Sequence, residues 1–124
     1  MSRDPWKLKV FEQADELVVQ VYLATRSLPV EERFGLQAQI RRAAVSIPAN
    51  IAEGYGRDQT GSFVQFLRIA QGSARELETH LILTERIRLA EQQTVAPLQE
   101  CCERISKMLR SLIRSLEARR AANQ

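Results

Sequence analysis

Few residues in this 124-residue chain have side chains suited to chemistry, and one small group of them is spaced for contact. His80 is the only histidine, and Glu76 precedes it by four positions, so the two side chains would share one face of a helix. A di-iron helical bundle needs two Glu-x-x-His motifs, whereas Leu77 occupies the position three before His80. The pattern favours a structural polar pair. A metal or small-molecule site at a subunit interface near Glu76 and His80 is kept as an alternative.

The two cysteines, Cys101 and Cys102, are adjacent, and the chain offers no third cysteine as a partner. Adjacent cysteines rarely bond to each other, so reduced thiols and a cytoplasmic location are expected. Cys102 falls on the apolar stripe of a predicted helix, where burial would raise its pKa and make it inert. We therefore predict no catalytic residue, no metal ligands and no cofactor, as is typical of a protein that is not an enzyme.

Basic residues give the clearest indication of a binding partner. The chain has 18 lysines and arginines against 15 acidic residues, a net charge of +3, and residues 91–124 hold six basic and four acidic side chains. Rows of arginine on exposed helix faces can follow phosphates, although a solvated surface is an equally simple interpretation. The candidate nucleic-acid contacts are Arg41, Arg42, Arg57, Arg68, Arg75, Arg86, Arg104, Lys107, Arg110 and Arg114.

The stretch RRAAVSIPANIAEGYGR, residues 41–57, has helical spacing despite Pro48 near its middle. Proline removes one hydrogen-bond donor and crowds the preceding turn, so a kink is expected. The Gly-x-Gly that closes the stretch has neither a preceding strand nor the Gly-Lys-Ser/Thr of a phosphate loop, so we expect Gly54 or Gly56 to end the helix in a left-handed turn. The residues predicted to form a structural polar network or an interface are Ser46, Asn50, Glu53, Ser73, Glu76 and His80.

Apolar periodicity predicts the elements that position these side chains. Apolar residues recur every three or four positions in four segments, at approximately 6–27, 32–55, 61–89 and 94–121. In the third segment the predicted buried stripe is Phe63, Leu67, Ala70, Ala74, Leu77 and Leu81. In the last segment it is Leu98, Cys102, Ile105, Leu109, Leu112 and Leu116. Four amphipathic helices with short connections indicate one domain over residues 1–124, all-α, folded as an antiparallel up-down-up-down four-helix bundle.

The third predicted helix carries a second, partly apolar stripe, formed by Ile69, Ser73, Glu76, His80, Leu83 and Ile87. A four-helix bundle buries one stripe per helix, so an extra stripe favours a homo-oligomer, and a monomer with broad core stripes is the alternative. No apolar run approaches the ~20 residues needed to cross a bilayer, so no membrane partner is expected.

Two segments, LPVEERFGLQAQIRRAAVSIPANIAEGYGR and FVQFLRIAQGSARELETHLILTERI, resemble the bacterial 23S rRNA intervening-sequence proteins. The most distinctive matching residues are Ser46 to Gly54, the motif FLxIAxGS from Phe66 to Ser73, and Glu76 to Glu78. The likeness extends from about Trp6 to Leu116. The resemblance implies a four-helix bundle that assembles into a homopentameric ring and has no enzymatic activity. It also implies a relationship to the accessory protein of diversity-generating retroelements, a basic pentamer that binds nucleic acid and a reverse transcriptase.

Composition, pattern and resemblance together predict a non-enzymatic, oligomeric helical bundle that binds RNA or DNA through basic surfaces. A scaffold that binds an unidentified protein, with no nucleic-acid role, is the second hypothesis. One departure from the family concerns the end of the third helix: relatives often have a glycine-containing turn there, whereas RIRLAEQQ contains no glycine.

Overall fold

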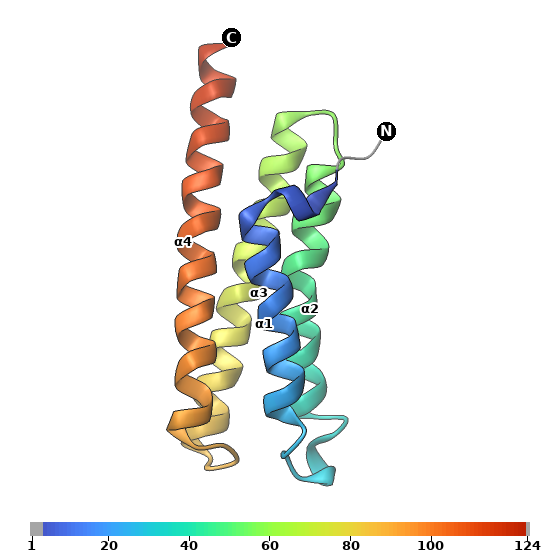
Figure 1. Cartoon of the computed structure of the whole chain (residues 1–124), viewed down its shortest axis with the longest axis vertical. Coiled ribbons are helices and arrows are strands. Elements are labelled where there is room, and N and C mark those ends of the chain that lie inside the picture. The colour runs from blue at the N-terminus through green and yellow to red at the C-terminus, as the bar shows by residue number, and fades with distance from the viewer. Residues whose placement is uncertain (1–3, 124) are drawn as a thin grey trace.

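The computed structural model describes residues 4–123, so the two ends of the predicted 1–124 domain lie outside the described residues. Within residues 4–123 the fold is all-α and contains no strand, as predicted (Figure 1). Two short 3₁₀ turns, η1 (Pro5–Lys7) and η2 (Val30–Glu32), precede the first and second α-helices. The four α-helices are α1 (Lys9–Thr25), α2 (Leu36–Tyr55), α3 (Thr60–Arg86) and α4 (Gln92–Ala122).

The four helices surround one apolar core. Helix α2 packs against both α1 and α3, and α4 packs against both α3 and α1. The α1–α2 and α3–α4 connections lie at one end of the bundle, and the α2–α3 connection lies at the other (Figure 1). Helix α4, with 31 residues, is the longest, and its C-terminal turns extend beyond the ends of its neighbours.

Most of the predicted apolar stripes are buried. In α3 the predicted core residues Phe63, Leu67, Ala70, Ala74, Leu77 and Leu81 are all buried. In α4 one position differs from the prediction, because Ile113 is buried and Leu112 is half-buried, whereas Leu116 at the end of the stripe is buried as predicted. Residues 112 and 113 lie on either side of the buried face, so the α4 core stripe is wider here than a single row.

The helix starts differ from the predictions where local turns intervene. Trp6 lies in η1, which begins after Asp4, whose Oδ1 accepts a hydrogen bond of 3.0 Å from the Trp6 backbone N–H. Leu8 is extended (φ −91°, ψ 122°), so α1 begins only at Lys9. Glu32 lies in η2, and α2 begins four residues later than predicted, at Leu36.

The helix ends also correct the sequence interpretation. The prediction of a left-handed glycine after the second helix is wrong, because Gly54 lies inside α2 and Gly56 has φ −79°. Helix α2 continues through Pro48 from Leu36 to Tyr55. Helix α3 ends at Arg86 rather than at residue 89, and among the described residues the only positive φ belongs to Arg88, at 63°. An arginine thus adopts the left-handed conformation that glycine takes more easily.

Gly54 is required by close packing between α2 and α3. A Cβ atom built on Gly54 would lie 2.6 Å from Phe66 Cβ, 3.0 Å from Phe63 Cδ1 and 3.2 Å from the Phe63 carbonyl oxygen. Contacts this short are not tolerated in packed interiors, so the two helix backbones approach each other only because this position has no side chain.

Gly54→Ala is expected to lower the free energy of unfolding by roughly 1–2 kcal/mol, because overpacking outweighs the ~1 kcal/mol that alanine gains over glycine in a helix. Urea unfolding followed by circular dichroism measures the change. Gly72→Ala is the matched control, since nothing lies within 4 Å of a Cβ at that α3 position. Equal stabilities of the two variants would contradict the close-packing argument.

Candidate functional site

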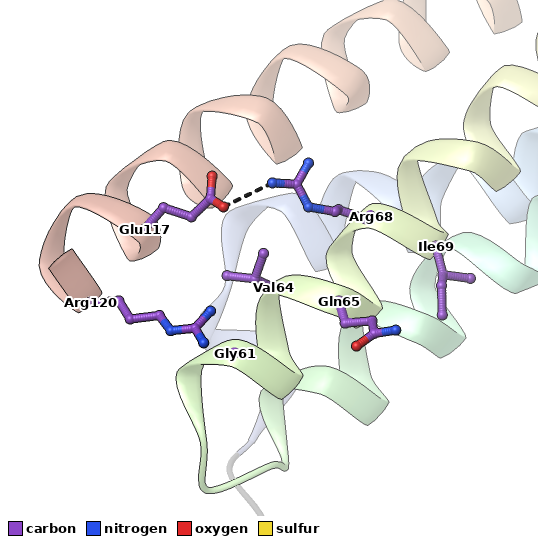
Figure 2. Close-up of a pocket in the computed structure, with 7 residues that line it drawn as sticks. All are labelled: Gly61, Val64, Gln65, Arg68, Ile69, Glu117 and Arg120. Carbon is purple, nitrogen blue, oxygen red and sulfur yellow. Dashed lines mark hydrogen bonds and ion pairs between the residues drawn. The ribbon is translucent and has the colours of Figure 1, made fainter.

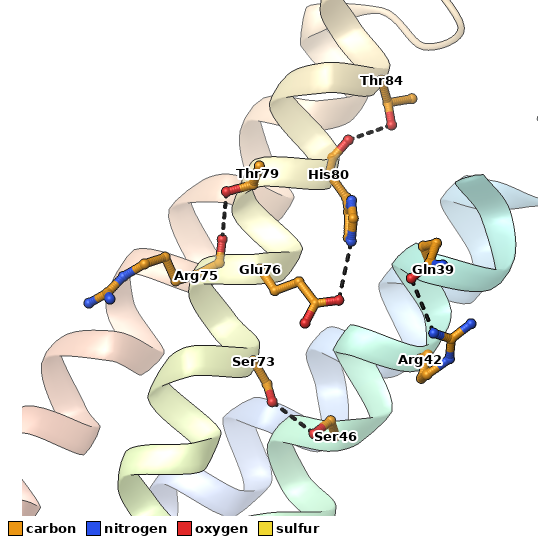
Figure 3. A network of polar contacts seen from close by, with 9 residues as sticks. All are labelled: Gln39, Arg42, Ser46, Ser73, Arg75, Glu76, Thr79, His80 and Thr84. Carbon is orange, nitrogen blue, oxygen red and sulfur yellow. Dashed lines mark hydrogen bonds and ion pairs between the residues drawn. The ribbon is translucent and has the colours of Figure 1, made fainter. Parts of the chain in front are cut away.

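Two of the predicted polar residues, Ser46 of α2 and Ser73 of α3, meet between the two helices (Figure 3). Ser46 Oγ lies 2.8 Å from Ser73 Oγ, and Ser73 Oγ also donates to the Ile69 carbonyl at 3.2 Å. Asn50 Nδ2 donates to the carbonyl oxygen and to Oγ of Ser46, at 2.8 and 3.0 Å. Ser46 therefore joins two helices. The structural interpretation of this network is supported by its geometry.

His80 and Glu76 form the expected pair on α3. His80 Nε2 lies 3.2 Å from Glu76 Oε2, and the histidine side chain is 21% exposed. Thr84 Oγ1 donates to the His80 carbonyl at 2.6 Å, which fixes the next turn of the same helix. Across residues 4–123, no group of three or more histidine, cysteine, aspartate or glutamate side chains is arranged to hold a metal ion. A metal site here would therefore need ligands from another chain.

Arg41 is one predicted nucleic-acid contact that the fold uses internally. Its Nε donates to Thr25 Oγ1 at 2.9 Å, and its Nη2 donates to the Tyr22 carbonyl at 3.3 Å. The guanidinium carbon lies 4.4 Å from the centroid of the Tyr22 ring, a cation–π distance. Arg41 thus ties α2 to the end of α1.

Arg57 and Arg42 also have partners within the bundle. Arg57 Nη2 lies 2.6 Å from Glu53 Oε1, and its guanidinium lies 5.0 Å from the Phe66 ring centroid. Arg42 Nη1 donates to Gln39 Oε1 at 3.1 Å on the exposed face of α2. Among the described residues, Arg57 is therefore paired with a carboxylate, whereas Arg42 is bonded to a neutral amide.

The largest group of unpaired cations lies on α4. From Arg104 to Arg120, this helix carries six basic residues and one acidic residue, Glu117. Lys107, Arg110 and Arg114 are exposed, and within the described chain none of them has a carboxylate oxygen within 4.0 Å. Their spacing of three and four residues places them along one face. We call these three residues the α4 basic row.

The other predicted basic residues lie in more mixed surroundings. Arg104 Nε donates weakly to Gln13 Oε1 at 3.4 Å, and Arg68 Nη2 lies 2.9 Å from Glu117 Oε2. Arg75 and Arg86 are exposed on α3.

Between α3 and α4, the pKa of the Glu78 carboxyl is raised by burial and by the nearby Glu103, and the charge of Arg75 partly opposes both effects. Acidic groups therefore dilute the positive charge midway along these helices.

Arg120 is a basic residue that the sequence analysis did not select. Its side chain and Glu117 from α4 line a groove of about 470 Å³ together with Arg68 and the start of α3 (Figure 2). The sequence places Arg120 three residues after Glu117, so it predicts that both side chains lie on one face of the helix. The groove could not be predicted from spacing, because it forms only where the end of α4 passes Gly61 in the first turn of α3.

The two thiols differ in burial. Cys102 is fully buried, and burial strongly raises the pKa of its thiol. Cys101 is half-buried, and its pKa is also raised by burial, with Arg104 partly lowering it through charge and a hydrogen bond. Both thiols are therefore held mainly in the protonated, weakly nucleophilic form near neutral pH.

Long amphipathic helices around one apolar core define this protein as a four-helix bundle. None of the helices in residues 4–123 is long and apolar enough to cross a membrane. The family model described as 23S rRNA-intervening sequence protein matches residues 6–111, and the chain belongs to that family.

A solved structure with the same fold comes from Bacteroides thetaiotaomicron. It is described as a protein of unknown function from the S23 ribosomal protein family. The two chains share 28% sequence identity with a TM-score of 0.78, and the match covers 84% of this chain and 97% of that one. A search of curated proteins finds no match to this chain.

Thiol labelling tests the burial of Cys102. In the Cys101→Ser variant, the remaining thiol should react with a disulfide reagent at least about 100-fold more slowly in the folded protein than in urea, because it is both inaccessible and protonated. The Cys102→Ser variant is the control, since the half-buried Cys101 should react at an intermediate rate. Fast labelling of folded Cys101→Ser protein would show that the α4 core contact opens readily.

Proposed function

We propose that this protein is a non-enzymatic, cytoplasmic, homo-oligomeric up-down-up-down bundle that binds RNA or DNA through its outer basic surface. The observation that carries the proposal is the α4 basic row, three exposed cations on one helix face that have no carboxylate partner within residues 4–123. Cations already paired within a protein must lose those contacts before they can bind phosphate, whereas these three are available.

The spacing of the α4 basic row suits a polyanion. Lys107 and Arg114 are seven residues apart, which corresponds to about 10 Å along a helix. A nucleic acid strand places phosphates about every 3.4 Å along a duplex axis, so a row of this length faces several of them. Arginine can also bind one phosphate through two parallel hydrogen bonds, which lysine cannot do.

The remaining predicted contacts contribute unequally to this proposal. Arg75 and Arg86 are exposed on α3 and would extend the positive surface. Arg41 and Arg57 are engaged within the bundle, so we assign them to structure rather than to the ligand. The family name and the ribosomal family of the Bacteroides protein make structured ribosomal RNA the first nucleic acid to test.

The proposed oligomer rests on the second stripe of α3. Ile69, Leu83 and Ile87 are 47%, 45% and 51% exposed, although each is a large apolar side chain. Apolar side chains spaced along one face favour contact with another protein surface, and the family resemblance suggests a ring of five copies. A ring would present the α4 basic row several times, so weak contacts would add up.

Replacing Lys107, Arg110 and Arg114 by glutamine should weaken binding to a structured RNA about 10–100-fold at low salt and reduce the salt slope by about 2–3. Fluorescence anisotropy at several salt concentrations measures both quantities. The control variant replaces Lys7, Arg26 and Arg33, which are also exposed and lie outside α4. Equal losses in the two variants would mean that net charge, not this row, determines affinity.

Sedimentation equilibrium tests the oligomer separately. The wild-type protein should have a mass of several chains at micromolar concentration. Ile69→Asp combined with Leu83→Asp should reduce that mass to one chain, because a buried unpaired charge strongly opposes association. The helical circular dichroism of the variant serves as the folding control. A wild-type mass of one chain would refute the oligomer.

A further inference from the structure

The groove that contains Arg120 lies apart from the α4 basic row. It is formed where the start of α3 meets the projecting end of α4, and Figure 2 shows Arg68, Glu117 and Arg120 around it. Lys107, Arg110 and Arg114 do not line it. The groove is open to solvent and mixes two guanidinium groups with the Gln65 amide. It therefore offers several hydrogen-bond donors to a single ligand group.

Gly61 allows the Arg120 side chain to lie against the first turn of α3. A Cβ atom built on Gly61 would lie 3.1 Å from Arg120 Cζ, and 3.1 and 3.2 Å from its two terminal nitrogens. Any other residue would push the guanidinium outward. The absence of a side chain at this position thus helps to determine where a charged group of another helix sits.

The charges in the groove are not balanced internally. Glu117, the only acidic residue among the described residues that line it, is paired with Arg68 at 2.9 Å. Arg120 has no carboxylate oxygen within 4.0 Å in the part of the chain that the structure describes. An unpaired guanidinium next to a paired one leaves net positive charge, which an anion would neutralise.

The start of α3 adds to this positive potential. Gln59, at the N-cap position, makes no side-chain capping hydrogen bond, and the first turn of α3 contains no acidic residue, although the exposed Asp58 directly precedes the cap. Backbone N–H groups at a helix start carry partial positive charge, so Arg120 lies where its own charge is unfavourable. An anion between the two would interact favourably with both.

We propose that this groove seats one phosphate of a bound nucleic acid strand, with Arg120 as the direct contact and Arg68 and Gln65 beside it. The proposal rests on the nucleic-acid function proposed above and adds a second contact point to it. We favour a strand over a small free phosphate compound because the groove is open to solvent and does not enclose a ligand. Arg120 lies six residues beyond Arg114, about 9 Å farther along α4 and about a third of a turn around it, so a strand that contacts both would pass partly around the helix.

Arg120→Gln and Arg119→Gln form a matched pair. Both remove one exposed cation near the end of α4, but Arg119 does not line the groove. With a labelled RNA duplex titrated at several salt concentrations, Arg120→Gln should reduce the salt slope by about 1. Arg119→Gln should change the slope much less.

Gly61→Asp provides a test that does not remove a cation. A carboxylate in the first turn of a helix favours the helix, so the thermal midpoint should not fall. The same carboxylate would lie next to Arg120 and compete with phosphate, so RNA affinity should fall about tenfold, as expected for loss of one charged contact. Gly61→Asn, of similar size without the charge, should weaken binding less.

The outcomes separate this proposal from the broader function. If the wild type binds RNA and the two arginine variants have equal salt slopes, the groove is not a phosphate site although the function stands. If the wild type binds no nucleic acid at low salt, both proposals fail. A further NMR titration follows the backbone amide resonance of Gly61 with pyrophosphate and, separately, with RNA. If pyrophosphate shifts this resonance and RNA does not, the groove binds a small phosphate compound, and its assignment to a nucleic acid strand is wrong.

Discussion

Close approach of α2 and α3 is the constraint on which the other positions depend. Gly54 lets the backbones meet, and Ala43, Ala44, Ala70 and Ala74 are buried small residues on the same two helices. The Ser46–Ser73 hydrogen bond satisfies polar groups inside this tight contact, where an unpaired hydroxyl would be costly. Because α4 packs against α3, the placement of α3 also decides which α4 residues face solvent.

Periodicity predicted the parts of the fold that are determined by burial. The α3 stripe from Phe63 to Leu81 is buried at every predicted position, because a long amphipathic helix has one way to hide its apolar face. The helix ends were predicted less well. Leu8 and Arg88 adopt backbone conformations that depend on neighbouring contacts, and neither is a glycine or proline that would have marked the turn.

The residues of the candidate site could be predicted from the sequence, but their arrangement between different helices could not. Sequence spacing placed Lys107, Arg110 and Arg114 on one face, since that relationship is local to a helix. It could not show that Arg41 reaches Thr25 or that Arg120 reaches Gly61, because both contacts join residues far apart in the chain. Sequence spacing alone therefore does not distinguish an arginine that bonds to another helix from one whose guanidinium is exposed to a ligand.

The projecting end of α4 has a consequence for local stability. Leu116 is the last buried residue of this helix, and the residues from Glu117 to Asn123 are all exposed. A few helical turns without apolar packing are marginal in water, so their amide protons should exchange with solvent by local opening, without unfolding of the bundle. The Glu117–Arg68 pair links this end to α3. Surface charge pairs weaken as ionic strength rises, so added salt should increase how often the last turns unfold.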